Sequence, residues 1–331
     1  MGDEFFSRYG LREPFEVLRV QGLAPPPLAS WSLPRRRWFN SPPFHCLLFL
    51  LTGLTTLAVG AHIAMNYQRN YPPFDWDFSR AFFTDFLHNP SLLKLGIPFS
   101  ATLLSILLAH ELGHYFTCRY YGIRATYPYF IPAPTLIGTL GAFIRIKTPI
   151  TTRRALFDVG ISGPLAGSII AIPALAVAIL NSKAVAPVSL PETISLGNSL
   201  VVILVSKILR SGVNPASLLL HPVGCAAWVG LFATALNLLP IGQLDGGHIL
   251  YAVLGERHRT ISRGLLLALV PLGIFCWAGW MVWAAMLLVL GLRHPAVMTS
   301  SQPLGKTREA LALVATLIFL LTFVPTPFII R

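Results

Sequence analysis

The chain has 331 residues, of which 54% are hydrophobic and only 11% are charged. Because an average soluble domain carries roughly 25% charged residues, this composition excludes an ordinary soluble protein and indicates a membrane protein. The net charge of +12 does not indicate a nucleic-acid-binding protein. The basic residues stand beside apolar runs, as they do at the cytoplasmic ends of membrane spans.

The first third of the chain predicts a tail and two membrane spans. Residues 1–43 mix charges with proline and lack apolar periodicity, so we expect a flexible or loosely docked cytoplasmic tail. Residues 44–65 form an apolar run about as long as the roughly 20 residues that cross a bilayer, and an external loop is expected to follow up to residue 96. The second predicted span, residues 97–116, carries the sequence AHELGH near its inner end.

Residues 127–147 are apolar but do not fit a helix. Three prolines fall within eight residues there, and glycine and β-branched residues follow. Because irregular backbone exposed to lipid would leave its amides unpaired, this segment is predicted to be a re-entrant hairpin or loop packed against protein.

The third predicted span, residues 158–180, opens with the sequence DVGISGPLAG. Gly163 and Gly167 are four residues apart, which puts two small residues on one helix face and allows a neighbouring helix to approach closely.

The remaining apolar segments are less uniform. Residues 181–221 are compatible with a surface segment, an extension of a helix or a broken span, and residues 222–239 predict a further span. Residues 264–292 are too long for one untilted crossing, which leaves a tilted span or a short hairpin. The last predicted span is residues 310–330.

These elements predict an all-α polytopic membrane protein with about six transmembrane helices. Its expected parts are the tail (1–43), the first helix with its external loop (44–96), a core (97–250) and C-terminal transmembrane helices (251–331).

Acidic residues at membrane depth mark the functional candidates, because placing one there costs about 2.5 to 3.5 kcal/mol on insertion scales. Of the thirteen acids, only Glu111 and Asp245 fall well inside predicted spans or at their inner ends. Asp158 stands at the start of a span, where the positive end of the helix dipole favours an acid without any catalytic role.

His110 and His114 are four residues apart, so on a helix they project from one face and can bind one metal ion, while the adjacent Glu111 can act as general base toward a water molecule. Two buried histidines bonded to backbone carbonyls would be the structural alternative. Catalytic zinc usually has three protein ligands. Asp245 is the acid at a suitable depth, and His248, three residues later, is the competing candidate.

Together, HELGH and NLLPIGQLDGG resemble the paired signature of the site-2 protease family, membrane-embedded zinc proteases that cut single-pass membrane proteins within or beside their spans. The similarity covers about residues 97–250. It implies one Zn²⁺ per chain held by His110, His114 and Asp245, with Glu111 as general base. Asn237 matches the asparagine thought to position substrate or stabilise the oxyanion, and Pro240 and Gly246 match structural positions.

Two other functions are weighed on the sequence. A zinc-binding membrane protein without hydrolysis, such as an inactive homologue or a metal carrier, would keep the ligands but has no use for the base Glu111. The sequence GISG at residues 160–163 fits the GxSG of rhomboid serine proteases, with Ser162 as nucleophile and His248 as base. Helix packing already accounts for these glycines, and Ser162 lies near the start of its span.

We therefore expect an intramembrane zinc protease whose partners are single-pass membrane proteins and the lipid bilayer, and not nucleic acid. Residues 137–146, with Gly138 and Gly141, are expected to receive the unwound substrate strand by edge pairing. Basic segments at the tail, at residues 145–154 and at residues 257–263 predict a metal site toward the cytoplasmic side. The expected location is a bacterial inner membrane, with an organelle membrane as the alternative.

Overall fold

A computed structural model describes residues 40–75, 88–185, 193–291 and 303–330. The chain divides into Met1–Asn40 and a compact unit, Ser41–Arg331, and all the elements below belong to the second. Most of the expected cytoplasmic tail, and part of the expected external loop, lie outside the described residues.

Three helices are long and apolar enough to cross a membrane. They are α3 (Pro42–Gln68), α5 (Ile97–Tyr120) and α6 (Arg153–Asn181), and they contain the three predicted spans 44–65, 97–116 and 158–180. The 3₁₀ turn η3 (Pro90–Gly96) leads directly into α5.

The other helices are shorter, and the predicted number of about six spans stays a prediction. They are α7 (Leu200–Leu209), α8 (Pro222–Asn237), α9 (Asp245–Leu254), α10 (His258–Phe275), α11 (Gly279–Leu290) and α12 (Lys306–Thr322). The segment 264–292 is a hairpin of two helices, since α10 packs on α11 after a break at residues 276–278.

The predicted last span, residues 310–330, is wrong in its second half. Helix α12 ends at Thr322, and the chain continues in extended form to β7 (Phe328–Ile330). Pro325 and Pro327 cannot donate to a helical hydrogen-bond ladder, and each disfavours helical geometry in the residue before it. Trp280 Nε1 donates to the Pro325 carbonyl at 2.7 Å and holds this segment in place.

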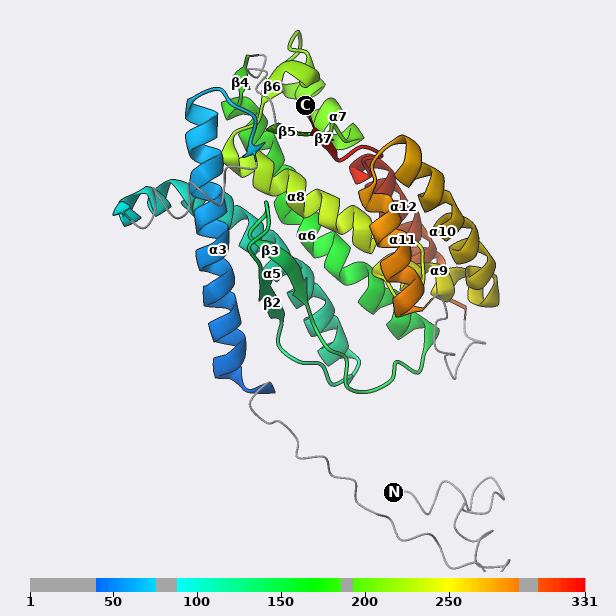
Figure 1. The fold of residues 1–331 in the computed structure, drawn as a ribbon. Coiled ribbons are helices and arrows are strands. Elements are labelled where there is room, and N and C mark those ends of the chain that lie inside the picture. The colour runs from blue at the N-terminus through cyan, green and yellow to red at the C-terminus, as the bar shows by residue number, and fades with distance from the viewer. Residues whose placement is uncertain (1–39, 76–87, 186–192, 292–302, 331) are drawn as a thin grey trace, which may run out of the picture. The chain divides into compact units, whose positions relative to one another are not determined.

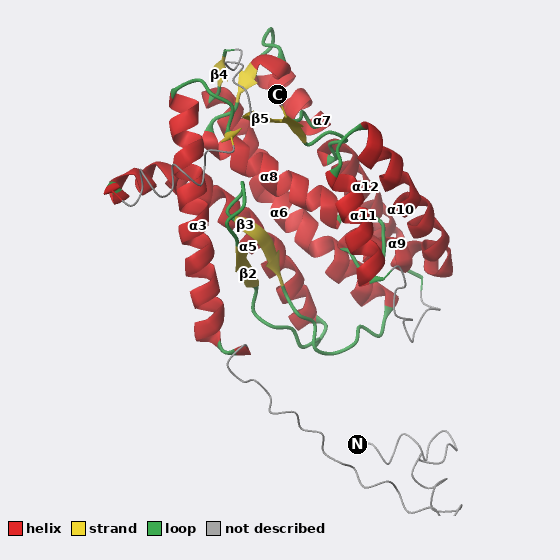
Figure 2. Ribbon diagram, in the orientation of Figure 1, coloured by secondary structure: helices red, strands yellow, loops and turns green. Residues whose placement is uncertain are grey.

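The described strands are short, and Figure 2 shows them in yellow beside the helices. Strand β5 (Thr193–Leu196) lies between β1 (Phe74–Asp75) and β7, antiparallel to both, and β4 (Lys183–Ala184) pairs with β6 (Leu218–Leu219). The described residues of the segment 181–221, which are 181–185 and 193–221, therefore contain one short helix, α7, flanked by strands and the turn η4 (Pro215–Ser217).

Residues 127–147 contain a β-hairpin made of β2 (Tyr129–Pro132) and β3 (Thr139–Phe143), which lies beside α3 and α5 (Figure 1). Thr55 Oγ1 of α3 donates to the Gly138 carbonyl at 2.6 Å. Gly138 has φ of +82°, and a Cβ there would lie 2.8 Å from the Thr55 carbonyl oxygen, so only glycine fits this tip against α3.

Helix α6 packs against α5, α8 and α9 and thereby lies at the centre of this helix group (Figure 1). Its contact with α5 is unusually close. A Cβ on Gly113 would lie 2.5 Å from the Ser162 carbonyl oxygen, and a Cβ on Gly163 would overlap the ring of His114. Larger residues at these two positions would force the helices apart.

Candidate metal centre

Three side chains from two helices converge beside the C-terminal half of α5. His110 and His114 come from α5, and Asp245 is the first residue of α9. The two histidine Nε2 atoms are 3.2 Å apart, and Asp245 Oδ2 lies 3.2 Å from His110 Nε2 and 3.3 Å from His114 Nε2. Both histidines are buried, and Asp245 is partly so.

This triangle has the dimensions of one face of a zinc coordination tetrahedron. Zinc binds nitrogen and oxygen ligands at about 2.0 to 2.1 Å, so ligand atoms in a tetrahedron are about 3.3 Å apart. Two imidazoles and one carboxylate also leave a fourth position open, as catalytic zinc requires. Within the described residues, no other group of three such side chains converges in this way. The donor set therefore fits zinc.

The backbone of α6 fixes the orientation of His114. Its Nδ1 donates to the carbonyl of Val159 at 2.7 Å, which leaves the lone pair of Nε2 directed toward the metal position. Gly163 leaves room for this ring, and Gly167 faces His110, where a Cβ would lie 3.4 Å from its Nδ1. The two glycines predicted to share a helix face thus both face metal ligands.

Asp245 is placed by a tight connection between α8 and α9. A Cβ on Gly246 would overlap the Leu238 carbonyl, so this position admits only glycine. The Pro240 carbonyl accepts a hydrogen bond from Ser262 of α10 at 3.2 Å. At the other end of α9, Arg153 Nη2 donates to the carbonyl of Ala252 at 2.6 Å. These contacts hold both ends of the short helix that carries the aspartate.

Glu111 is buried beside the first histidine, and its carboxylate accepts a hydrogen bond from the backbone of Ile144, directly after β3. A cavity of about 250 Å³ connects Glu111 and the three ligands with the hairpin residues Ala142, Phe143 and Ile144. Glu111 and a strand of the hairpin therefore face the same space.

Asn237, at the end of α8, also lines this cavity, and its amide nitrogen lies 3.3 Å from His110 Nε2. His248 lines the cavity too, but it is not part of the three-ligand group. The structure thus places Asp245, rather than His248, in the triangle with the histidines. Gly138 and Gly141 both have positive φ, and Gly138 is held against α3.

Ser162, the nucleophile in the serine-protease alternative, forms a hydrogen bond within its own helix. Ser162 Oγ donates to the Val159 carbonyl of its own helix at 2.9 Å, the same oxygen that accepts from His114. Sequence reasoning missed Val159, because a backbone carbonyl carries no signal in the residue type. It also missed Gln243, which lines the cavity and stands inside the quoted motif.

The sequence model of peptidase family M50 matches residues 98–275. The chain is similar to the probable zinc metalloprotease EGY1, chloroplastic, of rice (29% identity over 96% of this chain and 55% of the relative) and of Arabidopsis thaliana (29% over 96% and 58%). It is also similar to EGY2 of Arabidopsis thaliana (31% over 62% and 36%).

The chain spans somewhat more than half the length of the two EGY1 relatives. No solved structure matches it significantly.

Proposed function

Because the chain belongs to peptidase family M50, the site-2 protease family, we propose that it hydrolyses peptide bonds of single-pass membrane proteins within or beside their membrane-spanning segments. One observation carries the proposal. The cavity that holds Glu111 and the triangle of His110, His114 and Asp245 is also lined by the β-hairpin, so that ligands, base and a strand of the hairpin face one point.

The roles of the residues follow from their positions. His110, His114 and Asp245 would hold a zinc ion, and when bound it would supply Lewis-acid activation of the scissile carbonyl and of the attacking water. Glu111 accepts a proton from that water and later returns it to the leaving amine. Asn237, whose amide lies next to His110, holds the carbonyl oxygen of the substrate as charge develops on it.

The hairpin is the proposed substrate platform. A transmembrane helix has its backbone amides paired, so a substrate must unwind locally before attack. Among the described strands, β3 pairs only with β2, which leaves its other edge for an extended segment. Ala142 and Phe143 belong to this strand and line the cavity, so a strand added there would pass the ligands.

We further propose that the protein lies in a membrane with about six spans and that the hairpin enters the membrane from one side. Lys183, after the end of α6, donates to the carbonyl of Tyr67 near the end of α3 at 2.7 Å, so the starts of these two helices lie at the opposite end. Arg153 at the start of α6 binds Ala252, just before the basic segment 257–263. The basic segments 145–154 and 257–263 therefore lie at the same end, which supports a cytoplasmic orientation of the site.

The expected bacterial inner membrane gains no support from the relatives, because their names place them in chloroplasts. They favour the alternative, an organelle membrane.

The proposal is tested by locating the cut. Purified protein in detergent is incubated with a single-pass membrane protein whose span contains a glycine or proline, and the fragments are identified by mass spectrometry. Cleavage inside or next to the span is expected, with loss on chelation and recovery on adding zinc. Cleavage only in the soluble part of the substrate, or cleavage that survives chelation, would contradict the proposal.

A further inference from the structure

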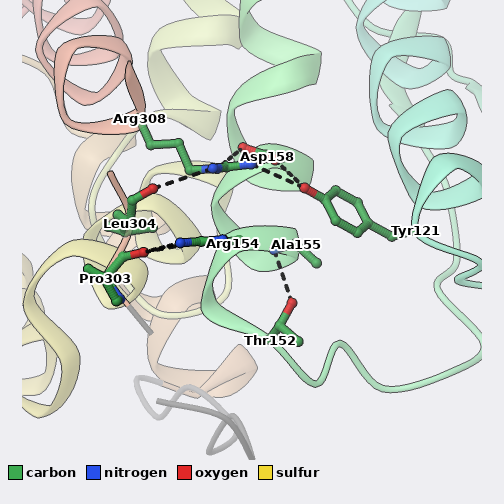
Figure 3. Close-up of polar contacts among 8 residues, drawn as sticks. All are labelled: Tyr121, Thr152, Arg154, Ala155, Asp158, Pro303, Leu304 and Arg308. Atoms are coloured by element: carbon green, nitrogen blue, oxygen red, sulfur yellow. Dashed lines mark hydrogen bonds and ion pairs between the residues drawn. The ribbon is translucent and has the colours of Figure 1, made fainter. Parts of the chain in front are cut away.

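A polar network ties α12 to α6 and to the end of α5 (Figure 3). Arg308 of α12 donates from Nε to Asp158 Oδ1 at 2.8 Å and from Nη2 to Asp158 Oδ2 at 2.7 Å. The same Nη2 lies 3.3 Å from the hydroxyl of Tyr121, which in turn donates to Asp158. A two-pronged arginine–carboxylate contact of this kind fixes direction as well as distance.

The Tyr121 hydroxyl stays protonated and acts as a hydrogen-bond donor to Asp158. Burial, followed by its hydrogen bond to Asp158, raises the pKa of the Tyr121 hydroxyl above its ordinary value. The network therefore joins the residue after α5 (Tyr121), a residue in α6 (Asp158) and a residue in α12 (Arg308).

Asp158 immediately precedes Val159, whose carbonyl accepts the hydrogen bond from His114. A carbonyl inside a helix cannot turn by itself, because its peptide is fixed by the helical ladder. The position of this acceptor consequently depends on how α6 sits along α5. Close contacts between the two helices occur at Gly113 and Gly163, which offer no side chain to interlock. Near the metal, Cys118 of α5 packs with Ala155 and Val159 of α6 in one apolar cluster, and the polar network adds a directional contact to this packing.

We propose that Arg308 is a positioning residue for the metal site: by holding Asp158 and Tyr121 together it fixes α6 against α5, and so sets the Val159 carbonyl that orients the imidazole of His114. The inference deepens the proposed function and rests on it, since it concerns the same zinc ligand. Partners of ligating histidines typically contribute 10- to 100-fold to metal affinity.

A neighbouring contact provides the matched control. Arg154 Nε and Nη2 donate to the carbonyl of Pro303 at 3.1 and 3.0 Å, so this arginine also anchors the segment before α12 to the start of α6 (Figure 3). No described bond links Arg154 to Asp158 or Tyr121. If zinc binding required only that α12 be anchored to α6, replacing either arginine would have the same effect on zinc affinity.

The test measures zinc affinity by chelator competition in the full-length protein, together with the ligand-field absorption of the cobalt-substituted protein. Arg308→Ala is expected to weaken zinc affinity about tenfold or more and to shift the cobalt spectrum. Arg308→Lys keeps the positive charge but lacks the two-pronged guanidinium group. Its zinc affinity and cobalt spectrum should be intermediate between those of Arg308→Ala and wild type. Arg154→Ala should match wild type in both readouts. In an Asp158→Ala background, Arg308→Ala should add little further loss.

Equal zinc affinity and spectrum in wild type and Arg308→Ala would overturn the inference, and so would an equal loss in Arg154→Ala. If Arg308→Ala does not fold, Arg308→Lys and Tyr121→Phe decide the question by the same readouts, with unchanged affinity and spectrum in both overturning it. A wild-type protein that binds no zinc would be a different result, because it would overturn the proposed function itself.

Discussion

Asp245 Oδ2 lies 3.2 Å from His110 Nε2, although the two residues stand in separate motifs far apart in the sequence. The aspartate belongs to the first turn of α9 and the histidine to the inner part of α5. Helix α6 packs against both of these helices. The metal site is thus assembled by helix packing, and changes to the packing surface should affect it as directly as changes to the ligands.

The first prediction concerns the ligand set. Purified protein should hold about one zinc per chain, and replacing His110, His114 or Asp245 by alanine should remove it, because each contributes one corner of the triangle. His248→Ala should keep the metal. Full zinc in Asp245→Ala combined with loss in His248→Ala, measured by elemental analysis, would show that the third ligand is misassigned.

The second prediction concerns the contact between α6 and α5. Gly163→Ala should displace the ring of His114, because the added Cβ would overlap it, and overpacking of this kind typically costs about 1 to 3 kcal/mol. Zinc content and thermal stability should both fall.

Gly264→Ala is the control for this change. It lies within α10, and a Cβ there would meet nothing within 4 Å. Helix propensity predicts that this variant is unchanged or up to about 1 kcal/mol more stable. Normal zinc binding in Gly163→Ala would mean that the close approach of the two helices is not needed.

The third prediction concerns the hairpin. Thr55→Val keeps the shape of the side chain and removes the donor to the Gly138 carbonyl, a loss of about 0.5 to 1.5 kcal/mol. Amide exchange in residues 129–143 should become faster, and substrate affinity should weaken more than zinc affinity. Thr102→Val, whose hydroxyl bonds only its own helix at Pro98, is the control. Identical amide exchange rates in both variants would show that the hydrogen bond from Thr55 of α3 does not stabilise the hairpin.

The fourth prediction concerns orientation. In a protein without native cysteines, Thr151→Cys before α6 should react with an impermeant thiol reagent from the cytoplasmic side. Val185→Cys beyond the other end should react from the opposite side, since α6 is long enough to cross the bilayer. Labelling of residue 151 from the far side would overturn the topology, and labelling of both from one side would show that α6 does not span.

The sequence predicted those parts of the fold that depend on local pattern. Apolar runs of sufficient length located α3, α5 and α6, and the i, i+4 spacing of His110 and His114 located half of the metal site, because both follow from helical geometry. Asp245 was placed by the scarcity of acids at membrane depth and by the resemblance.

Some of the features that the sequence analysis missed depend on contacts between distant parts of the chain. The end of α12 was predicted too late, although Pro325 and Pro327 signalled it. The bond from His114 to Val159 was invisible because a backbone acceptor carries no residue signature. Asp158 was interpreted as an acid favoured at the start of a helix, and only the packing of α12 on α6 brings Arg308 to it.

We propose that Glu111 acts on water beside a metal that it does not bind, and the Glu111→Gln variant separates these two roles. Wild type and variant are purified in detergent, their zinc content is measured, and both are given the same single-pass substrate. We expect the two proteins to have the same zinc content. Cleavage by Glu111→Gln should be at least about 10²-fold slower, because the glutamine amide cannot accept the proton from water. Equal cleavage by the two proteins at equal zinc content would contradict it.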